Sequence, residues 1–400
     1  MVPRPDVAHP PEDRRRLTVL RRRAQLLTGG VPGAPADVVR HLLAMQGQDY
    51  PGVLWSVGLR SGGTEGEVAA SLADGSLVRS WPLRGTLHLT APEDLRWLLD
   101  LTGERTAARY RTNYRDRGLD QETFDRSQDV LTGALQGGRR RIRQELFTEL
   151  AAAGIDPSGQ RGINILGYLS MKQILVVGPH DGRQPTYALL EEWVRPGDRP
   201  ERDEGLGRLA LRYFTSHGPA TVRDLAWWSG LTLTEARRGL EIASPSLATF
   251  ELGSTSYHLS PEVFDGGDAG PDDRALLLPG FDEYLLGYTD RSAAIRPEHD
   301  ELVLPGKNGM FLATMLLDGE VVGTWRRLLG PRDTVTLEWR TFQTLPDREL
   351  RRFEESAEAY AGYLGRTLRT TPPMSAAAQA PATPPDPGAP PGSVPTPRPR

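Results

Sequence analysis

The pattern of apolar and polar positions predicts one structural unit that recurs three times: helices followed by a short two-stranded hairpin. The clearest copy spans residues 205–260. In it, an apolar-periodic helix precedes a helix–turn–helix segment with Ser229 and Gly230 at the turn and Thr232 capping the next helix. Strands over 247–252 and 257–260 complete this copy.

The two other copies lie earlier in the chain. The copy within 139–194 has a helix from 142 to 154, a second from 163 to 173, and strands 174–179 and 185–193 around a turn at 180–183. The copy within 14–97 has helices at 14–27, 36–46 and 67–75 and a hairpin over 76–90 that turns at 82–85. Helices at 91–101 and 104–114 link these two copies.

Helices followed by a hairpin are the plan of a winged-helix module, in which a helix enters a DNA groove and the hairpin touches the backbone. Tandem winged helices also serve as protein-binding scaffolds, and that alternative stays open. The following region, 270–345, is strand-rich with a tight hairpin at Asp318–Gly319, and a helix over 346–366 follows it.

The sequence therefore predicts an α+β fold that is predominantly α. Its parts are a disordered start (1–12), winged-helix modules at 13–120, 121–200 and 201–265, and a β-rich region with a terminal helix (266–369). A disordered Pro/Ala-rich tail over 370–400 ends the chain. Residues 371–400 hold 11 of the 34 prolines and no aromatic residue, so they cannot bury enough apolar surface to fold.

Composition excludes several classes of site. The chain has no cysteine, and its seven histidines lie too far apart in sequence for a short metal-ligand motif, so we expect no metal site. No apolar run is long enough for a transmembrane helix, and the first 16 residues lack the apolar stretch of a signal peptide. We therefore expect a cytoplasmic protein that does not bind membranes.

The charge distribution bears on nucleic-acid binding. A net charge of −4 argues against a wholly basic binder but allows a local basic face. Among the 48 basic residues only Lys172 and Lys307 are lysines, which leaves a Schiff-base mechanism just two candidates. A GC-rich genome accounts for the arginine bias. Arginine also binds phosphates and base edges bidentately.

Two glutamines stand out near residue 46. Val38, Leu42 and Met45 share one helical face, and Pro51–Gly52 is expected to stop the helix, so Gln46 and Gln48 are predicted at a helix end. Amides in this position either cap the helix or hydrogen-bond a ligand.

This motif and four longer segments resemble the AlkZ-like DNA glycosylases, winged-helix enzymes that excise alkylated bases. The motif is Gln46-Gly47-Gln48, preceded by HLLAM and followed by Asp49. The matching segments are VRSWPLRGTLH (78–88), APEDLRWLL (91–99), LLPGFDEYLLGYTDR (277–291) and DGEVVGTWRR (318–327). The resemblance covers about residues 14–345.

The resemblance implies three tandem winged-helix modules that form a basic concave surface for duplex DNA. It also implies a monofunctional glycosylase that uses neither metal nor cofactor, with Gln46 and Gln48 as the catalytic motif residues. The family usually has a small apolar middle residue, where this chain has Gly47, which loosens the backbone. The related YcaQ branch has Asp at the second motif position, so Gln48 places this chain on the AlkZ side.

Amide side chains constrain the substrate. A neutral glutamine supplies neither acid nor base, but it can hold a water and the sugar in line. That suffices only when the leaving group is already good. An N7-alkylated purine is cationic and departs as a neutral base, so we expect a glycosylase for such lesions, including bulky or cross-linking ones, in DNA repair or self-resistance.

Further residues are candidates for DNA contact or for lining the lesion pocket, each with a structural alternative. Arg79 and Arg84 would contact phosphates or stay solvated, Trp81 would stack on bases or pack in the core, and His88 would contact a phosphate, line the pocket or bond a backbone carbonyl. An arginine cluster opposes the helix dipole at a predicted helix start, which favours phosphate contact over a solvated face. Its members are Arg139, Arg140, Arg141 and Arg143. Lys307 lies in a loop that contacts DNA or simply turns.

Two other functions remain as alternatives. A non-catalytic winged-helix regulator would bind specific DNA sequences and release no base, and an inactive paralogue would retain only the fold. The segment FDEYLLGYTDR suggests an ion-paired corner at Asp282, Glu283, Asp290 and Arg291 rather than a carboxylate hydrolase site. The chain lacks a long heptad stretch, and we expect a monomer.

Overall fold

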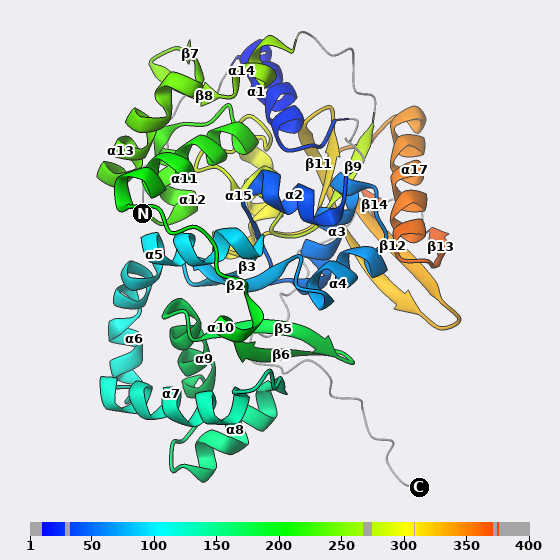
Figure 1. Cartoon of the computed structure of the whole chain (residues 1–400). Helices are drawn as coiled ribbons and strands as arrows, with labels where there is room; N and C mark the ends of the chain where they lie inside the picture. Colours follow the sequence, from blue (N-terminus) through cyan, green and yellow to red (C-terminus); the bar gives the residue numbers. More distant parts are fainter. Residues whose placement is uncertain (1–9, 29–32, 267–273, 308, 371–373, 376–400) are drawn as a thin grey trace, which may run out of the picture.

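The protein has a mixed architecture of helices and two larger antiparallel-rich sheets, seen in a computed structural model (Figure 1). The structure describes residues 10–28, 33–266, 274–307, 309–370 and 374–375. Residues 1–9 of the segment predicted to be disordered, and most of the predicted tail, lie outside this range. Among the described residues, none of the helices has the length and apolar character to cross a membrane.

Four helices form the N-terminal part: α1 (Pro11–Ala24), α2 (Pro35–Leu42), α3 (Tyr50–Ser61) and α4 (Glu65–Ala73). Helix α1 begins inside the segment predicted to be disordered. The helix predicted over 36–46 ends at Leu42, because Leu43 has a φ of 68° that a helix cannot accommodate. Strand β1 (Ala44–Gln46) follows. Pro51 does not stop a helix but lies in the first turn of α3, where its missing N–H costs nothing.

The hairpins of the first two predicted units join in one six-stranded sheet. Its strand order is β1-β3-β2-β5-β6-β4, with β2 (Val78–Leu83), β3 (Thr86–Thr90), β4 (Arg141–Ile142), β5 (Leu175–Asp181) and β6 (Gln184–Leu189). The β2–β3 turn uses Arg84 and Gly85 with φ of 55° and 78°. Figure 1 shows the two hairpins side by side in the middle of the molecule. Strand β1 is an edge of this sheet.

Helices cover and extend this sheet: α5 (Pro92–Arg109), α6 (Arg111–Asp116), α7 (Gln121–Leu135), α8 (Arg143–Ala152), α9 (Arg161–Met171) and α10 (Leu190–Trp193). The helix predicted over 91–101 continues without a break to Arg109. The strand predicted over 185–193 ends at Leu189 because α10 takes over.

The third unit matches its prediction closely. It contains α11 (Arg202–His217), α12 (Val222–Ser229), α13 (Leu233–Ala243), β7 (Ala248–Leu252), β8 (Thr255–Leu259) and α14 (Pro261–Asp265), with a 3-10 turn at Ser244–Ser246. Gly230 ends α12 with a φ of 80°, and the Thr232 hydroxyl accepts a hydrogen bond from the N–H of Glu235. These are the turn and cap that the sequence predicts.

The C-terminal region is a second sheet with a helix against it. Its path is β13-β12-β11-β10-β9, from β9 (Ala275–Leu278), β10 (Thr314–Leu317), β11 (Glu320–Gly330), β12 (Thr334–Thr341) and β13 (Thr367–Thr370), and β14 (Met374–Ser375) also pairs with β12. Helix α17 (Asp347–Tyr363) packs on β9. The Asp318–Gly319 turn is tight, as predicted, with φ of 51° and 89°. Strand β14 lies within the segment predicted to be disordered.

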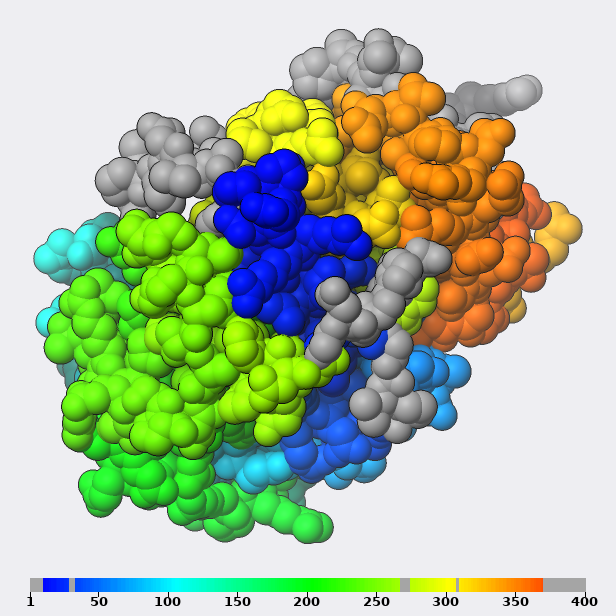
Figure 2. All heavy atoms as spheres, turned by 90° about the horizontal axis from the view of Figure 1, so that it is seen from above, coloured from blue at the N-terminus to red at the C-terminus, as the bar shows by residue number. Residues whose placement is uncertain are grey.

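Short helices fill the connection between β9 and β10: α15 (Glu283–Leu286), α16 (Asp300–Val303) and 3-10 turns at Pro297–His299 and Pro305–Lys307. Helix α1 packs Leu17 and Leu20 against Phe250 and Tyr257 of the third unit. Figure 2 shows α1, in dark blue, between the green segment before residue 265 and the yellow C-terminal region. The N-terminal helices thus connect the third unit to the C-terminal sheet.

Candidate active site

The Gln-x-Gln motif lies on an edge strand, not at a helix end. Strand β1 pairs antiparallel with β3 so that Gln46 lies opposite His88, and the N–H of Gly47 donates to the carbonyl of Leu87 over 2.7 Å. Gln48 is exposed and Gln46 is half-buried. Because the strand exits the sheet directly after Gln46, the Gln48 side chain reaches the surface beside the start of α3, whereas Gln46 Oε1 is buried.

The motif backbone is fixed by a buried arginine. Arg79 on β2 donates to the carbonyl of Gly47 from Nε (3.0 Å) and Nη2 (2.7 Å), and it is 6% exposed. Burial lowers the pKa of Arg79. Its guanidinium also lies 5.2 Å from the ring centre of Tyr50, the first residue of α3. Predicted as a DNA contact, Arg79 instead binds the motif itself.

Gly47 is not demanded by the backbone. A Cβ added there would lie 3.6 Å from Arg79 Nε and from the backbone of His88 and Leu89, which is ordinary van der Waals contact, and the φ of Gly47 is not in the left-handed region. A small side chain such as the family's usual residue would therefore fit at this position. The two hydrogen bonds from Arg79 restrain the Gly47 carbonyl.

A row of polar side chains crosses the sheet behind the motif. Gln46, His88 and Ser80 are direct cross-strand neighbours, so their side chains share one face, and Thr90 lies two residues beyond His88 on the same face. Buried atoms of all four have no hydrogen-bond partner within the described residues: Gln46 Oε1, His88 Nε2, Ser80 Oγ and Thr90 Oγ1. Unsatisfied buried groups gathered at one place are typical of a functional site.

His88 is neutral at physiological pH. Burial, and next the nearby Arg84 charge, lower its pKa to about 4. Its Nδ1 lies 2.9 Å from the carbonyl of Thr86, which fixes Nδ1 as the protonated nitrogen and leaves Nε2 as an acceptor. His88 is 0% exposed, so contact with a phosphate is ruled out, whereas a place behind the lesion pocket stays open.

Glu283 was predicted to belong to an ion-paired corner, but it hydrogen-bonds the motif instead. Glu283 Oε1 accepts the N–H of Gln46 over 2.9 Å, and Oε2 accepts the indole N–H of Trp228 over 2.9 Å. Burial by itself would raise the pKa of Glu283, but the imidazoles of His217 and His88 and the Arg84 guanidinium outweigh it and lower the pKa to about 2. The carboxylate is therefore ionised beneath the motif.

An ion pair is seen at the preceding residue of this segment, but with a partner from α3 that the sequence did not predict. Asp282 forms a bidentate pair with Arg60 of α3, at 2.8 Å and 2.9 Å, and both side chains are buried. Nothing local in the sequence distinguishes Glu283 from Asp282, because the contact with Gln46 spans 237 residues.

Trp81 and Arg84 turn toward the protein. Trp81 packs against the apolar core around α7 and α9. Arg84 donates to the carbonyl of Trp228, and its guanidinium lies 5.1 Å from the ring centre of Trp227. The hairpin that carries them therefore joins the second and third units.

The arginine cluster lies apart from the motif, at β4 and the start of α8. Arg139 donates to the carbonyls of Gln136 and Gly133, and Arg141 lies 3.6 Å from Glu145. Arg140 lies over Trp193, 5.4 Å from the ring centre, and Arg143 is exposed. Lys307 belongs to a 3-10 turn, and its side chain lies outside the described part of the structure.

The β5–β6 hairpin also reaches the motif, which the sequence did not predict. His180 near its tip stacks on Tyr50 with ring centres 4.1 Å apart. The start of α3 is therefore held between the first and second units. This contact brings the second predicted unit to a residue that lies two positions after Gln48.

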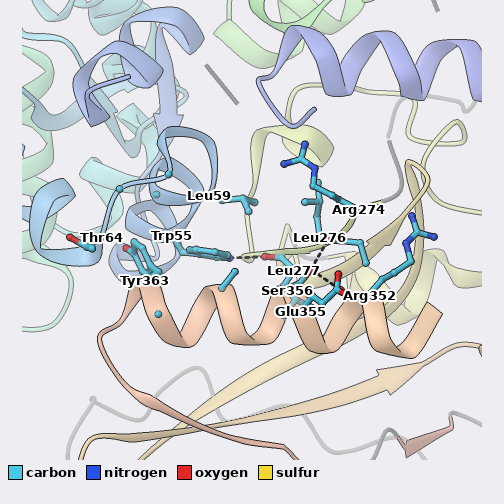
Figure 3. Close-up of a pocket in the computed structure, with 16 residues that line it drawn as sticks. Trp55, Leu59, Thr64, Arg274, Leu276, Leu277, Arg352, Glu355, Ser356 and Tyr363 are labelled. Atoms are coloured by element: carbon cyan, nitrogen blue, oxygen red, sulfur yellow. Dashed lines mark hydrogen bonds between the residues drawn. The ribbon is translucent and has the colours of Figure 1, made fainter. Parts of the chain in front are cut away.

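A cavity of about 420 Å³ lies between α3, β9 and α17 (Figure 3). Trp55 and Tyr363 line one part of it and Arg274 and Arg352 another, and the indole N–H of Trp55 donates to the carbonyl of Leu277. Its lining includes no motif residue. Across the residues that the structure describes, no three His, Asp or Glu side chains are placed to hold a metal ion.

Comparisons with known proteins bear directly on this site. The profile of the family described as DNA glycosylase AlkZ-like matches residues 39–363, which include the motif, Arg79 and Glu283. The chain belongs to the AlkZ-like DNA glycosylase family. The resemblance seen in the motif and its four flanking segments is thereby confirmed, and with it the assignment to the DNA glycosylases.

A sequence match and a structural match both come from Streptomyces sahachiroi. The chain is 28% identical over 327 residues to a protein named interstrand DNA cross-link repair glycosylase, an alignment that covers 78% of this chain and 87% of the relative. It also resembles the solved structure of the DNA glycosylase AlkZ with a TM-score of 0.73 at 24% identity, covering 89% of this chain and 99% of the other. The second likeness shows that the AlkZ-like chain has the AlkZ fold.

Proposed function

We propose that this AlkZ-like protein hydrolyses the N-glycosidic bond of cationic N7-alkylated purines in double-stranded DNA, including bulky and cross-linking adducts, in DNA repair or self-resistance. Gln46 and Gln48 are the catalytic residues in this proposal. The observation that carries it is the fixed motif: the Gln48 side chain is exposed and the Gln46 side chain is half-buried, while Arg79, β3 and Glu283 hold the motif backbone.

The chemistry follows from the types of side chain present. Amides orient a water and the sugar but exchange no proton at neutral pH, so the bond must break with the base already positively charged. The carboxylate that is hydrogen-bonded to the motif backbone, Glu283, is 1% exposed and occupied by two N–H donors. It is therefore not placed to act as a general base on DNA.

We interpret the three helix-and-hairpin units as winged-helix modules. The third supports this best, because α12, α13 and the β7–β8 hairpin have the helix–turn–helix and wing order. The arginines at 139–143 are the proposed phosphate contacts, since Arg140 and Arg143 are exposed. The name of the S. sahachiroi relative, an interstrand cross-link repair glycosylase, supports a cross-linked substrate here as well.

Release of free base from a duplex that carries N7-methylguanine tests the proposal. We expect the parent protein to release the base, and Gln48→Ala to lose on the order of 100-fold in single-turnover rate, because misplacing the reacting groups costs about that much. Tight, sequence-specific DNA binding without base release, on both N7-methylguanine and a cross-linked duplex, would favour a non-catalytic regulator instead.

A further inference from the structure

The buried carboxylate of Glu283 hydrogen-bonds the backbone of the edge strand β1. As an edge strand, β1 leaves alternate N–H groups pointing away from its neighbour β3. The N–H of Gly47 is taken by the carbonyl of Leu87, whereas the N–H of Gln46 donates to Glu283 Oε1 at 2.9 Å. Glu283 thus takes the place that a further strand would occupy beside the catalytic residue.

Glu283 is itself held rigidly. It is the first residue of α15, where the Asp282 side chain accepts the N–H of Tyr284 over 2.9 Å. Asp282 is in turn clamped by Arg60 of α3, the helix that follows the motif. The motif is therefore fixed on its N-terminal side by Glu283 and on its C-terminal side by the helix that anchors Asp282.

We propose that Glu283 is a positioning residue for base release, which sets the place of the Gln46 side chain through its hydrogen bond to the Gln46 backbone. This inference rests on the proposed function for its effect on rate, but the hydrogen bond can be tested separately. In this proposal the rate of base release depends on the acceptor oxygen that faces Gln46 and not on the negative charge of the carboxylate.

Three variants separate the acceptor from the charge and from packing. Glu283→Met removes both acceptor oxygens at similar length. Trp228→Phe removes the indole donor and part of the buried ring but leaves the bond to Gln46, so it is the control for lost packing in the same place. The third variant is the double variant Glu283→Gln with Trp228→Phe. Its carboxamide oxygen can accept the backbone N–H of Gln46, because the competing indole N–H of Trp228 is gone. Its NH2 group then faces His217 Nε2.

We expect the single-turnover release rate to fall on the order of 100-fold in Glu283→Met, with the Kd for lesion-containing DNA unchanged, since only positioning is lost. Trp228→Phe and the double variant should release base at rates close to the parent. A double variant as slow as Glu283→Met would overturn the inference and assign the effect to charge. Losses that merely follow the melting temperature across all three variants would overturn it in favour of a structural role.

Hydrogen exchange at the backbone N–H of Gln46 tests the hydrogen bond without any measurement of activity. Exchange should speed up on the order of 10-fold or more in Glu283→Met and stay near the parent rate in the double variant. Unchanged protection in Glu283→Met would refute the inference even if the parent released no base. Failure of the parent to release N7-methylguanine, with the exchange result as expected, would count against the proposed function alone.

Discussion

Replacing Gly47 with alanine asks whether the motif needs a glycine at its centre. The added Cβ would make contacts at 3.6 Å, and the backbone is not left-handed, so alanine fits without strain. At a compatible position, Gly→Ala stabilises a protein by about 0.4–1 kcal/mol, because the unfolded chain loses freedom. For a chain of 400 residues we expect the melting temperature to rise by about 0.5–1 °C.

The assay is thermal unfolding together with the release of N7-methylguanine, with Gly103→Ala as the matched control. A Cβ at Gly103 of α5 would lie 2.6 Å from the carbonyl oxygen of Met171, so that variant should lose about 1–3 kcal/mol by overpacking. Gly47→Ala should keep the parent's rate of base release. A lower melting temperature or a lost activity in Gly47→Ala would refute the account of how Arg79 and β3 hold the motif.

Three further predictions follow from single residues. Arg79→Met removes both guanidinium hydrogen bonds to the Gly47 carbonyl and should lower the free energy of unfolding in urea by about 2–4 kcal/mol. An unchanged free energy of unfolding would contradict the stabilising role of these hydrogen bonds. The pKa of His88 is lowered to about 4 in the folded protein, so protonation favours the unfolded chain as the pH falls. Between pH 6.5 and pH 4 the free energy of unfolding of the parent should therefore fall by about 3 kcal/mol more than that of His88→Gln, measured by unfolding at each pH. Parallel curves of unfolding free energy against pH would disprove a buried neutral imidazole. Arg143→Gln should lower the steepness of a plot of log binding constant for DNA against log salt concentration by about one unit. Arg199→Gln is the control, because Arg199 pairs with Asp100, and it should leave that slope unchanged. Equal slopes for the two variants would show that the arginine cluster is not part of the DNA interface.

Local signals in the sequence predicted the elements that depend on local chemistry. The turn at Gly230, the cap at Thr232 and the tight Asp318–Gly319 hairpin all appear as expected, since each is decided by residues within one turn of chain. The motif residues were also found from sequence, although their setting was not.

Features that depend on distant contacts escaped prediction. The apolar period runs unbroken through Leu43, so only the tertiary structure shows that the helix stops there and that Gln46 joins a sheet. The two hairpins join into one sheet where Arg79 of β2 pairs with Val177 of β5, and no local pattern encodes that pairing. Glu283 and Arg79 act on the motif through hydrogen bonds across long stretches of chain, and their residue types alone suggested an ion pair and a phosphate contact.

Comparing the release of a cationic base with that of a neutral base tests most directly the claim that neutral amides catalyse the reaction. Two duplexes of the same sequence, one with N7-methylguanine and one with the neutral base hypoxanthine at the same position, would be incubated with excess protein, and the free base would be measured over time. We predict release of N7-methylguanine, lost in Gln48→Ala, and no release of hypoxanthine above the rate without protein. Comparable release of both bases would contradict catalysis by neutral amides.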